Sequence, residues 1–162
     1  MLRNNGSNYR WFILALSSIT STFAVAMPWM SMTVLFKEIS EELSLNLVQV
    51  GTIWGILPLS GILVAQIGGM LGDRFGAKNV LGVTCLLAGL VSASRGLPDS
   101  FIPLAAIMFL FGLPIAIIPL MVTKNVGTWF QGPRLALAQS VVTVSMALGF
   151  TLGTLLSATV FS

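Results

Sequence analysis

Residues 69–78 read Gly-Met-Leu-Gly-Asp-Arg-Phe-Gly-Ala-Lys, a short polar stretch that separates two long apolar segments. It carries a carboxylate and two basic groups, whereas charged residues make up only 8% of the whole chain. Gly76 permits the positive φ of a tight turn, which most other residues adopt only with strain. These features predict a charged hairpin at residues 69–78 that joins two apolar helices.

The composition of the chain identifies the solvent around those helices. Hydrophobic residues make up 56% of the sequence, whereas a typical soluble domain contains about 25% charged residues. No soluble core could bury so much apolar surface, so the surrounding solvent is expected to be a lipid bilayer. The predicted fold class is an all-α membrane protein.

Five apolar segments have roughly the length of about 20 residues that a membrane-spanning helix needs. They are expected at about residues 11–36, 47–71, 79–94, 101–122 and 135–160, within a single transmembrane domain that covers residues 1–162. The first segment is too long for a cleaved signal peptide, and no clear Ala-x-Ala cleavage site follows it. Short links favour antiparallel neighbours, which predicts a polytopic bundle of five transmembrane helices.

The charged residues fall unevenly on the two sides of the predicted bundle. The N-terminus and the even-numbered links carry one acid, Asp73, and six basic residues: Arg3, Arg10, Arg74, Lys78, Lys124 and Arg134. The opposite side carries Lys37, Arg95, Glu38, Glu41, Glu42 and Asp99. The positive-inside rule then places the N-terminus and the hairpin in the cytoplasm, in a protein integral to the cell (plasma or inner) membrane. The net charge of +3 is therefore a signal of topology and does not indicate a nucleic-acid partner.

Several chemistries are excluded by what the chain lacks. It contains no His and one Cys, which excludes His-based catalysis, His/Cys metal sites and intrachain disulfides. Cys85 lies in an apolar run, where a small core residue is its expected role. No charged residue needs to lie deep in the membrane, so an acidic proton carrier is not expected. The sequence predicts no enzyme activity, no catalytic residues, no cofactor and no metal.

Small residues and prolines set the packing of the predicted helices. Small residues four positions apart let membrane helices approach closely. Two such stripes lie at Gly61, Ala65 and Gly69 and at Ser145, Gly149, Gly153 and Ser157. Prolines within predicted helices are expected to kink them at Pro28, Pro58, Pro114 and Pro119. Such kinks suit a cavity with moving walls, and they suit a static membrane bundle equally well.

The pattern Gly69-x-x-x-Asp73-Arg74-x-Gly76-x-Lys78 resembles the signature between helices two and three of the major facilitator superfamily. Ala77 stands where that signature usually has Arg. The match follows the second predicted span on the expected cytoplasmic side, which is where the family carries its signature. The resemblance covers all five segments and implies an incomplete N-terminal half of the family's fold, from helix one to helix five.

Other parts of the chain agree with this resemblance in part. Residues 43–51 resemble the family's entry into helix two, and residues 129–134 resemble its link from helix four to helix five. Helix four of the family often carries an Arg at the position of Met108, and its absence weakens a proton-coupled mechanism. No Pro follows Gly149 or Gly153, so the family's antiporter signature is not supported.

The resemblance implies that the hairpin is a gating motif formed by Gly69, Asp73, Arg74, Gly76 and Lys78. In the family this hairpin is a cytoplasmic latch, and its Asp holds the two helical bundles together in the outward-open state. A carboxylate near the C-terminal end of a helix also opposes the helix dipole, which independently predicts a specific partner for Asp73. We expect that local partner to be Arg74 or Lys124, the latter from the next cytoplasmic link.

The family's substrate sites lie near the middle of the membrane, lined by helices one, two, four and five of each half. The matching candidates here are Thr22 and Trp29 on the first helix, Trp54 on the second, and Gln139 and Thr143 on the fifth. Each has an alternative role. Trp29 could form one of two interfacial aromatic belts, and Thr side chains in membrane helices often bond to the backbone.

The resemblance implies a fragment of a secondary active transporter that moves a small solute by alternating access. Family members usually have twelve spans in two halves, so the expected partners are the bilayer, the solute and the missing C-terminal half of the same transporter. The alternative is a complete, small integral-membrane protein that oligomerises through its small-residue stripes and has a structural or assembly role. A reading frame that continues past Ser162 would favour the first interpretation.

Overall fold

The computed structural model describes residues 5–160, and Arg3 of the charge pattern lies outside them. The described residues contain helices and no β-strand. The helices are α1 (Asn5–Thr20), η1 (Ser21–Ala26), α2 (Met27–Glu42), α3 (Leu47–Phe75), α4 (Ala77–Ala93), η2 (Ser94–Gly96), α5 (Phe101–Trp129) and α6 (Pro133–Val160). The run α1–η1–α2 is continuous and forms the first long helix. Among residues 5–160, five helices are long and apolar enough to cross a membrane, which confirms the predicted all-α fold class.

Two local signals set the ends of α3. At its start, Asn46 Oδ1 accepts a hydrogen bond from the Gln49 N–H at 2.8 Å, and Gln49 Oε1 accepts one from the Asn46 N–H at 2.9 Å. This capping box satisfies two backbone donors that a helix start leaves unpaired. At its end, Gly76 adopts φ 82° and is the single residue between α3 and α4. Residues 69–78 are therefore helical except for Gly76, which alone forms the turn between α3 and α4.

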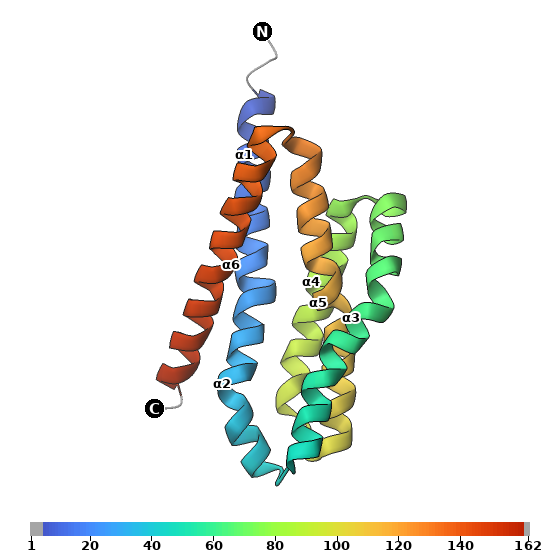
Figure 1. The fold of residues 1–162 in the computed structure, drawn as a ribbon, viewed down its shortest axis with the longest axis vertical. Coiled ribbons are helices and arrows are strands. Elements are labelled where there is room, and N and C mark those ends of the chain that lie inside the picture. The colour runs from blue at the N-terminus through green and yellow to red at the C-terminus, as the bar shows by residue number, and fades with distance from the viewer. Residues whose placement is uncertain (1–4, 161–162) are drawn as a thin grey trace.

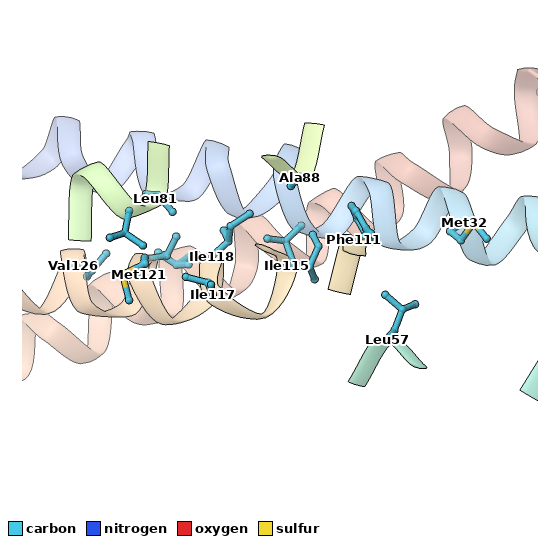
Figure 2. Close-up of a cluster of buried hydrophobic side chains, with 14 of the residues drawn as sticks. Met32, Leu57, Leu81, Ala88, Phe111, Ile115, Ile117, Ile118, Met121 and Val126 are labelled. Carbon is cyan, nitrogen blue, oxygen red and sulfur yellow. The ribbon is translucent and has the colours of Figure 1, made fainter. Parts of the chain in front are cut away.

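α5 lies at the centre of the bundle. It packs along α3 and α4, it touches the first helix, and α6 packs along the first helix on the other side. Figure 1 shows the result as two groups, with α6 beside α1 and α2, and with α3, α4 and α5 together. Buried side chains of α5 run through the middle of the core, including Phe111, Ile115, Ile118, Met121 and Val126 (Figure 2).

Glycines on α3 let it approach α5 closely. A Cβ added at Gly61 would lie 3.2 Å from Ala116 Cβ, and one at Gly68 would lie 2.8 Å from Ile117 Cγ1. A Cβ at Gly69, in contrast, would meet nothing within 4 Å. The predicted contact stripe was therefore right at Gly61 and wrong at Gly69, because the face of α3 that meets α5 passes through Gly68.

The small-residue stripe of α6 lies at a close helix contact, as its spacing predicted, and the structure identifies the first helix as its neighbour. A Cβ at Gly149 would lie 2.8 Å from the backbone oxygen of Thr22, and one at Gly153 would lie 3.0 Å from that of Met27. Ser145 Oγ donates a hydrogen bond to the Ser18 carbonyl at 3.3 Å. Backbone approaches this close leave no room for a larger side chain at Gly149 or Gly153.

The first helix contains a π-helical segment, η1, which ends two residues before Pro28. Proline has no N–H and its ring clashes with the carbonyl four residues earlier, which here belongs to Ala24. Widening the helix over Ser21–Ala26 accommodates that clash without breaking the helix. The sequence predicted a kink at Pro28 but gave no sign that it would take the form of a π-helix.

One charged residue is not where the sequence placed it. The sequence assigns Arg95 to a link on the side of the membrane opposite the hairpin, and no charge was expected deep in the membrane. In the structure the Arg95 guanidinium lies 3.3 Å from the centre of the Phe111 ring, and its Nε atom is buried. α4 and η2 together span fewer residues than α5, and the Arg95 side chain reaches Phe111, the eleventh residue of α5.

Candidate functional site

The hairpin at the end of α3 brings together an acid and a base that are distant in sequence. Lys124 of α5 donates a hydrogen bond from Nζ to Oδ1 of Asp73, and the two groups form an ion pair. Gly72 makes this contact sterically accessible, because a Cβ there would lie 3.5 Å from Lys124 Nζ and 2.6 Å from Met121 Sδ. The absent side chain at Gly72 thus lets α5 bring Lys124 alongside Asp73.

The ion pair lies at the surface of the bundle. The Asp73 side chain is 78% exposed and that of Lys124 is 34% exposed. Exposed ion pairs of this kind stabilise a protein by roughly 0–1 kcal/mol. The contact is therefore weak enough for Asp73 to exchange Lys124 for another cation at little energetic cost.

The other basic residues of the hairpin lie elsewhere. The Arg74 guanidinium lies 5.5 Å from the centre of the Phe75 ring, and Lys78 is exposed on the first turn of α4. Of the two expected local partners of Asp73, the structure brings Lys124 into contact. Sequence alone left Arg74 and Lys124 open, because the register between α3 and α5 decides between them.

Two of the substrate-lining candidates meet between the first helix and α3. The Trp29 and Trp54 rings are edge-to-face with their centres 6.4 Å apart, and the Phe36 ring lies 5.3 Å from that of Trp54. Aromatic pairs in this geometry contribute about 0.5–1.5 kcal/mol beyond the apolar area that they bury. Trp29 and Trp54 are half-buried and keep part of each ring accessible.

The remaining candidates bond to the backbone. The Thr22 hydroxyl lies 2.8 Å from the Ser145 carbonyl and 3.0 Å from the Ser18 carbonyl, and Thr22 is buried. Gln139 Nε2 donates to the Thr123 carbonyl at 3.4 Å, and Thr143 donates to the Gln139 carbonyl at 3.0 Å. Of the five candidates, the structure thus places Trp29 and Trp54 in contact with each other. Thr22, Gln139 and Thr143 instead donate hydrogen bonds to backbone carbonyls of their own or a neighbouring helix.

Two comparisons with known proteins agree with this architecture. The profile of the family described as Major Facilitator Superfamily matches residues 14–162. The hexuronate transporter of Bacillus subtilis (strain 168) is 29% identical to the chain over 111 residues, which cover 68% of this chain and 26% of that relative. The chain therefore matches about a quarter of the length of that curated relative. No solved structure matches the chain significantly.

Proposed function

The chain belongs to the major facilitator superfamily, and we propose that it supplies the first five helices of a secondary active transporter that works by alternating access. Family membership and the similarity to a curated transporter support a role in transport. In alternating access one helical bundle rocks against another around a central solute site. We therefore propose that these helices act with a second bundle of the same transporter.

The single observation that carries the gating proposal is the exposed contact between Asp73 and Lys124. A carboxylate in the last turn of α3 is unfavourable for the helix dipole unless a cation compensates it. Lys124 supplies that cation within this bundle. We propose that Asp73 exchanges Lys124 for a basic group or a helix N-terminus of the second bundle, and that this exchange closes the cytoplasmic side.

For the solute, we propose a small molecule with a ring face that stacks on the accessible parts of Trp29 and Trp54. The aromatic pair supports this proposal because aromatic rings bind the apolar faces of ring-shaped solutes. The relative's name makes hexuronates the first solutes to test. Met108, the eighth residue of α5, is fully buried and has no charge with which to bind a solute carboxylate, so such a solute needs a cation from another position.

The charge distribution supports a cytoplasmic position for the hairpin. Arg10, Arg74, Lys78, Lys124 and Arg134 all lie at the end of the bundle that contains Gly76, as the bounds of the helices require. Basic residues near the ends of membrane helices favour the cytoplasmic side. We propose a protein of the cell membrane with its N-terminus in the cytoplasm.

Replacing Asp73 by Asn tests the gating proposal. In a transporter that contains both bundles, we expect Asp73→Asn to lower initial uptake about tenfold or more, because an amide cannot form the ion pairs that bias the two states. Membrane insertion, measured by the amount of detergent-extracted folded protein, should not change. Asp99→Asn, an exposed acid at the opposite end, is the matched control. Unchanged uptake by Asp73→Asn would refute the gating role.

A further inference from the structure

A cleft with two arginines lies at the end of the bundle where α1, the end of α5 and the start of α6 meet (Figure 1). It consists of two adjoining cavities, of about 480 Å³ and 250 Å³, whose walls share Arg10, Phe130 and Arg134. The larger cavity continues between α1 and α6, where its walls are formed by Trp11, Leu14, Leu137, Ala138 and Val141. The smaller cavity lies against the link from α5 to α6 and is also lined by Thr128, Trp129 and Gln131.

The polar and apolar walls of the cleft follow one another along the helices. The two guanidinium groups border both cavities, and the apolar wall of the larger cavity extends from them toward the middle of the bundle. Val141 lies about 10 Å along α6 from Arg134, and Leu14 lies about 6 Å along α1 from Arg10, at about 1.5 Å per residue. A phospholipid carries its phosphate and its acyl chains in this same order across the leaflet.

Aromatic rings place the two arginines at the depth of the lipid head groups. The Trp11 and Phe130 rings are edge-to-face with their centres 5.7 Å apart, and the Tyr9 and Trp129 rings have centres 5.0 Å apart. Trp and Tyr side chains concentrate at the interface between membrane and water. The guanidinium of Arg10 lies 6.0 Å from the centre of the Trp11 ring, so its charge lies in this aromatic layer.

The cleft is positively charged, and its walls contain no acid. Among the described residues, no Asp or Glu lines either cavity. Asp73 is the one acid at this end of residues 5–160, and it pairs with Lys124. α6 begins at Pro133, so the partial positive charge of its N-terminus lies beside Arg134. The cleft therefore favours an anion.

The apolar part of the cleft is too short for another membrane helix. One turn beyond Leu14, the Ser18 carbonyl accepts a hydrogen bond from Ser145 Oγ at 3.3 Å. One turn farther, a Cβ added at Gly149 would lie 2.8 Å from the backbone oxygen of Thr22. The first helix and α6 are thus in contact beyond the cleft, whereas a membrane helix has about 20 residues. A flexible acyl chain, in contrast, can enter a short cleft and leave it toward the bilayer.

We propose that this cleft binds an anionic glycerophospholipid, with its phosphate between Arg10 and Arg134 and the first part of one acyl chain against the apolar wall. Arginine binds phosphate oxygens through charge-assisted hydrogen bonds, and basic pockets between membrane helices bind anionic head groups. A free phosphate would contact the arginines and leave the apolar wall uncovered, whereas a lipid covers both. The site is separate from the Asp73–Lys124 pair, so it does not depend on the proposed gating role.

A photoreactive phosphatidylglycerol, with a diazirine on one acyl chain near the glycerol, tests this proposal. The matching phosphatidylcholine is the zwitterionic probe. The 162-residue chain is reconstituted in phosphatidylcholine bilayers with either probe, and mass spectrometry locates the adducts. The readout is the labelled fraction of residues 11–14 and 137–141. We expect the anionic probe to label these residues about tenfold more than the zwitterionic probe, because two arginines attract it.

Variants of the two arginines test whether their charges cause this preference. Arg134→Gln should lower the preference about threefold or more, and Arg10→Gln combined with Arg134→Gln should remove it. Arg10→Lys combined with Arg134→Lys keeps both charges and should keep most of the preference. Lys78→Gln removes one exposed charge at the same end without altering the cleft, so it is the matched control and should leave the preference intact. Circular dichroism of each variant verifies its helix content.

Inorganic phosphate, added at matched ionic strength, distinguishes a lipid from a soluble anion. It should leave the preference intact, because it does not cover the apolar wall. Loss of the preference in its presence would identify a soluble anion as the ligand and would contradict the proposal, as would equal labelling by the two probes. The same labelling is expected in a transporter that contains both bundles. Its absence there would show that protein covers the cleft, and the proposal would then be wrong.

Discussion

At the scale of single residues, the glycines have different roles although they look alike in the sequence. A Cβ at Gly149 would lie 2.8 Å from the Thr22 carbonyl oxygen and 2.9 Å from Thr22 Cα, which are backbone atoms and cannot move aside cheaply. A Cβ at Gly69 would meet nothing within 4 Å. The close approach of α6 to the first helix therefore depends on Gly149, whereas the conformation of α3 does not depend on Gly69.

We expect Gly149→Ala to lower the free energy of unfolding by about 1–3 kcal/mol, because the added methyl forces α6 away from the first helix. Gly69→Ala should raise it slightly or leave it unchanged, since Ala favours a helix by roughly 0.5–1 kcal/mol over Gly. Unfolding in detergent, followed by circular dichroism, measures both. A loss of stability in Gly69→Ala equal to that in Gly149→Ala would contradict the packing described for α3.

At the scale of elements, hydropathy predicted five membrane helices and the structure has them, but the register between helices lay beyond the sequence. Spacing of small residues identifies a helix that can approach a neighbour, yet it does not say which neighbour. The rule selected Gly61, Ala65 and Gly69, and the contact with α5 uses Gly61 and Gly68. The same register decides that Lys124 meets Asp73. The π-helix escaped prediction because proline in a helix is compatible with several distortions.

The π-helix before Pro28 leads to a second test at this scale. We expect Pro28→Ala to restore an α-helical hydrogen bond to the Ala24 carbonyl and to convert Ser21–Ala26 to α-helix. Hydrogen exchange of the amides in residues 21–26 should then slow by about tenfold, which corresponds to about 1.4 kcal/mol of added protection. Pro58→Ala in α3 is the control and should leave these amides unchanged. Unaltered exchange in Pro28→Ala would show that Pro28 does not cause the π-helix.

At the scale of the whole molecule, the charged residues lie at the two ends of the bundle that their links predict, and Arg95 is the exception. Counting charges by link assigns each residue to a side of the membrane, but it ignores how far each helix extends. α4 and η2 together end at Gly96, and the Arg95 side chain reaches Phe111, about 15 Å along the longer α5 from its start. Arg95 therefore lies near Phe111 inside the bundle, although its link belongs to the far side. Depth depends on relative helix lengths and tilts, which emerge only when the helices pack.

The orientation of the whole bundle is directly measurable. The test introduces Asp99→Cys or Lys78→Cys into a Cys85→Ser background and adds a membrane-impermeant maleimide to intact cells. We expect the reagent to label Asp99→Cys and to leave Lys78→Cys unlabelled, with yields that differ by about tenfold or more. The reason is that the bilayer excludes the charged reagent. Both residues are exposed, and they lie at opposite ends of α4 and its link to α5. Permeabilised cells are the control, since both positions should then react. Labelling of Lys78→Cys in intact cells would reverse the topology and would place the Asp73–Lys124 pair outside, where it could not gate the cytoplasmic side.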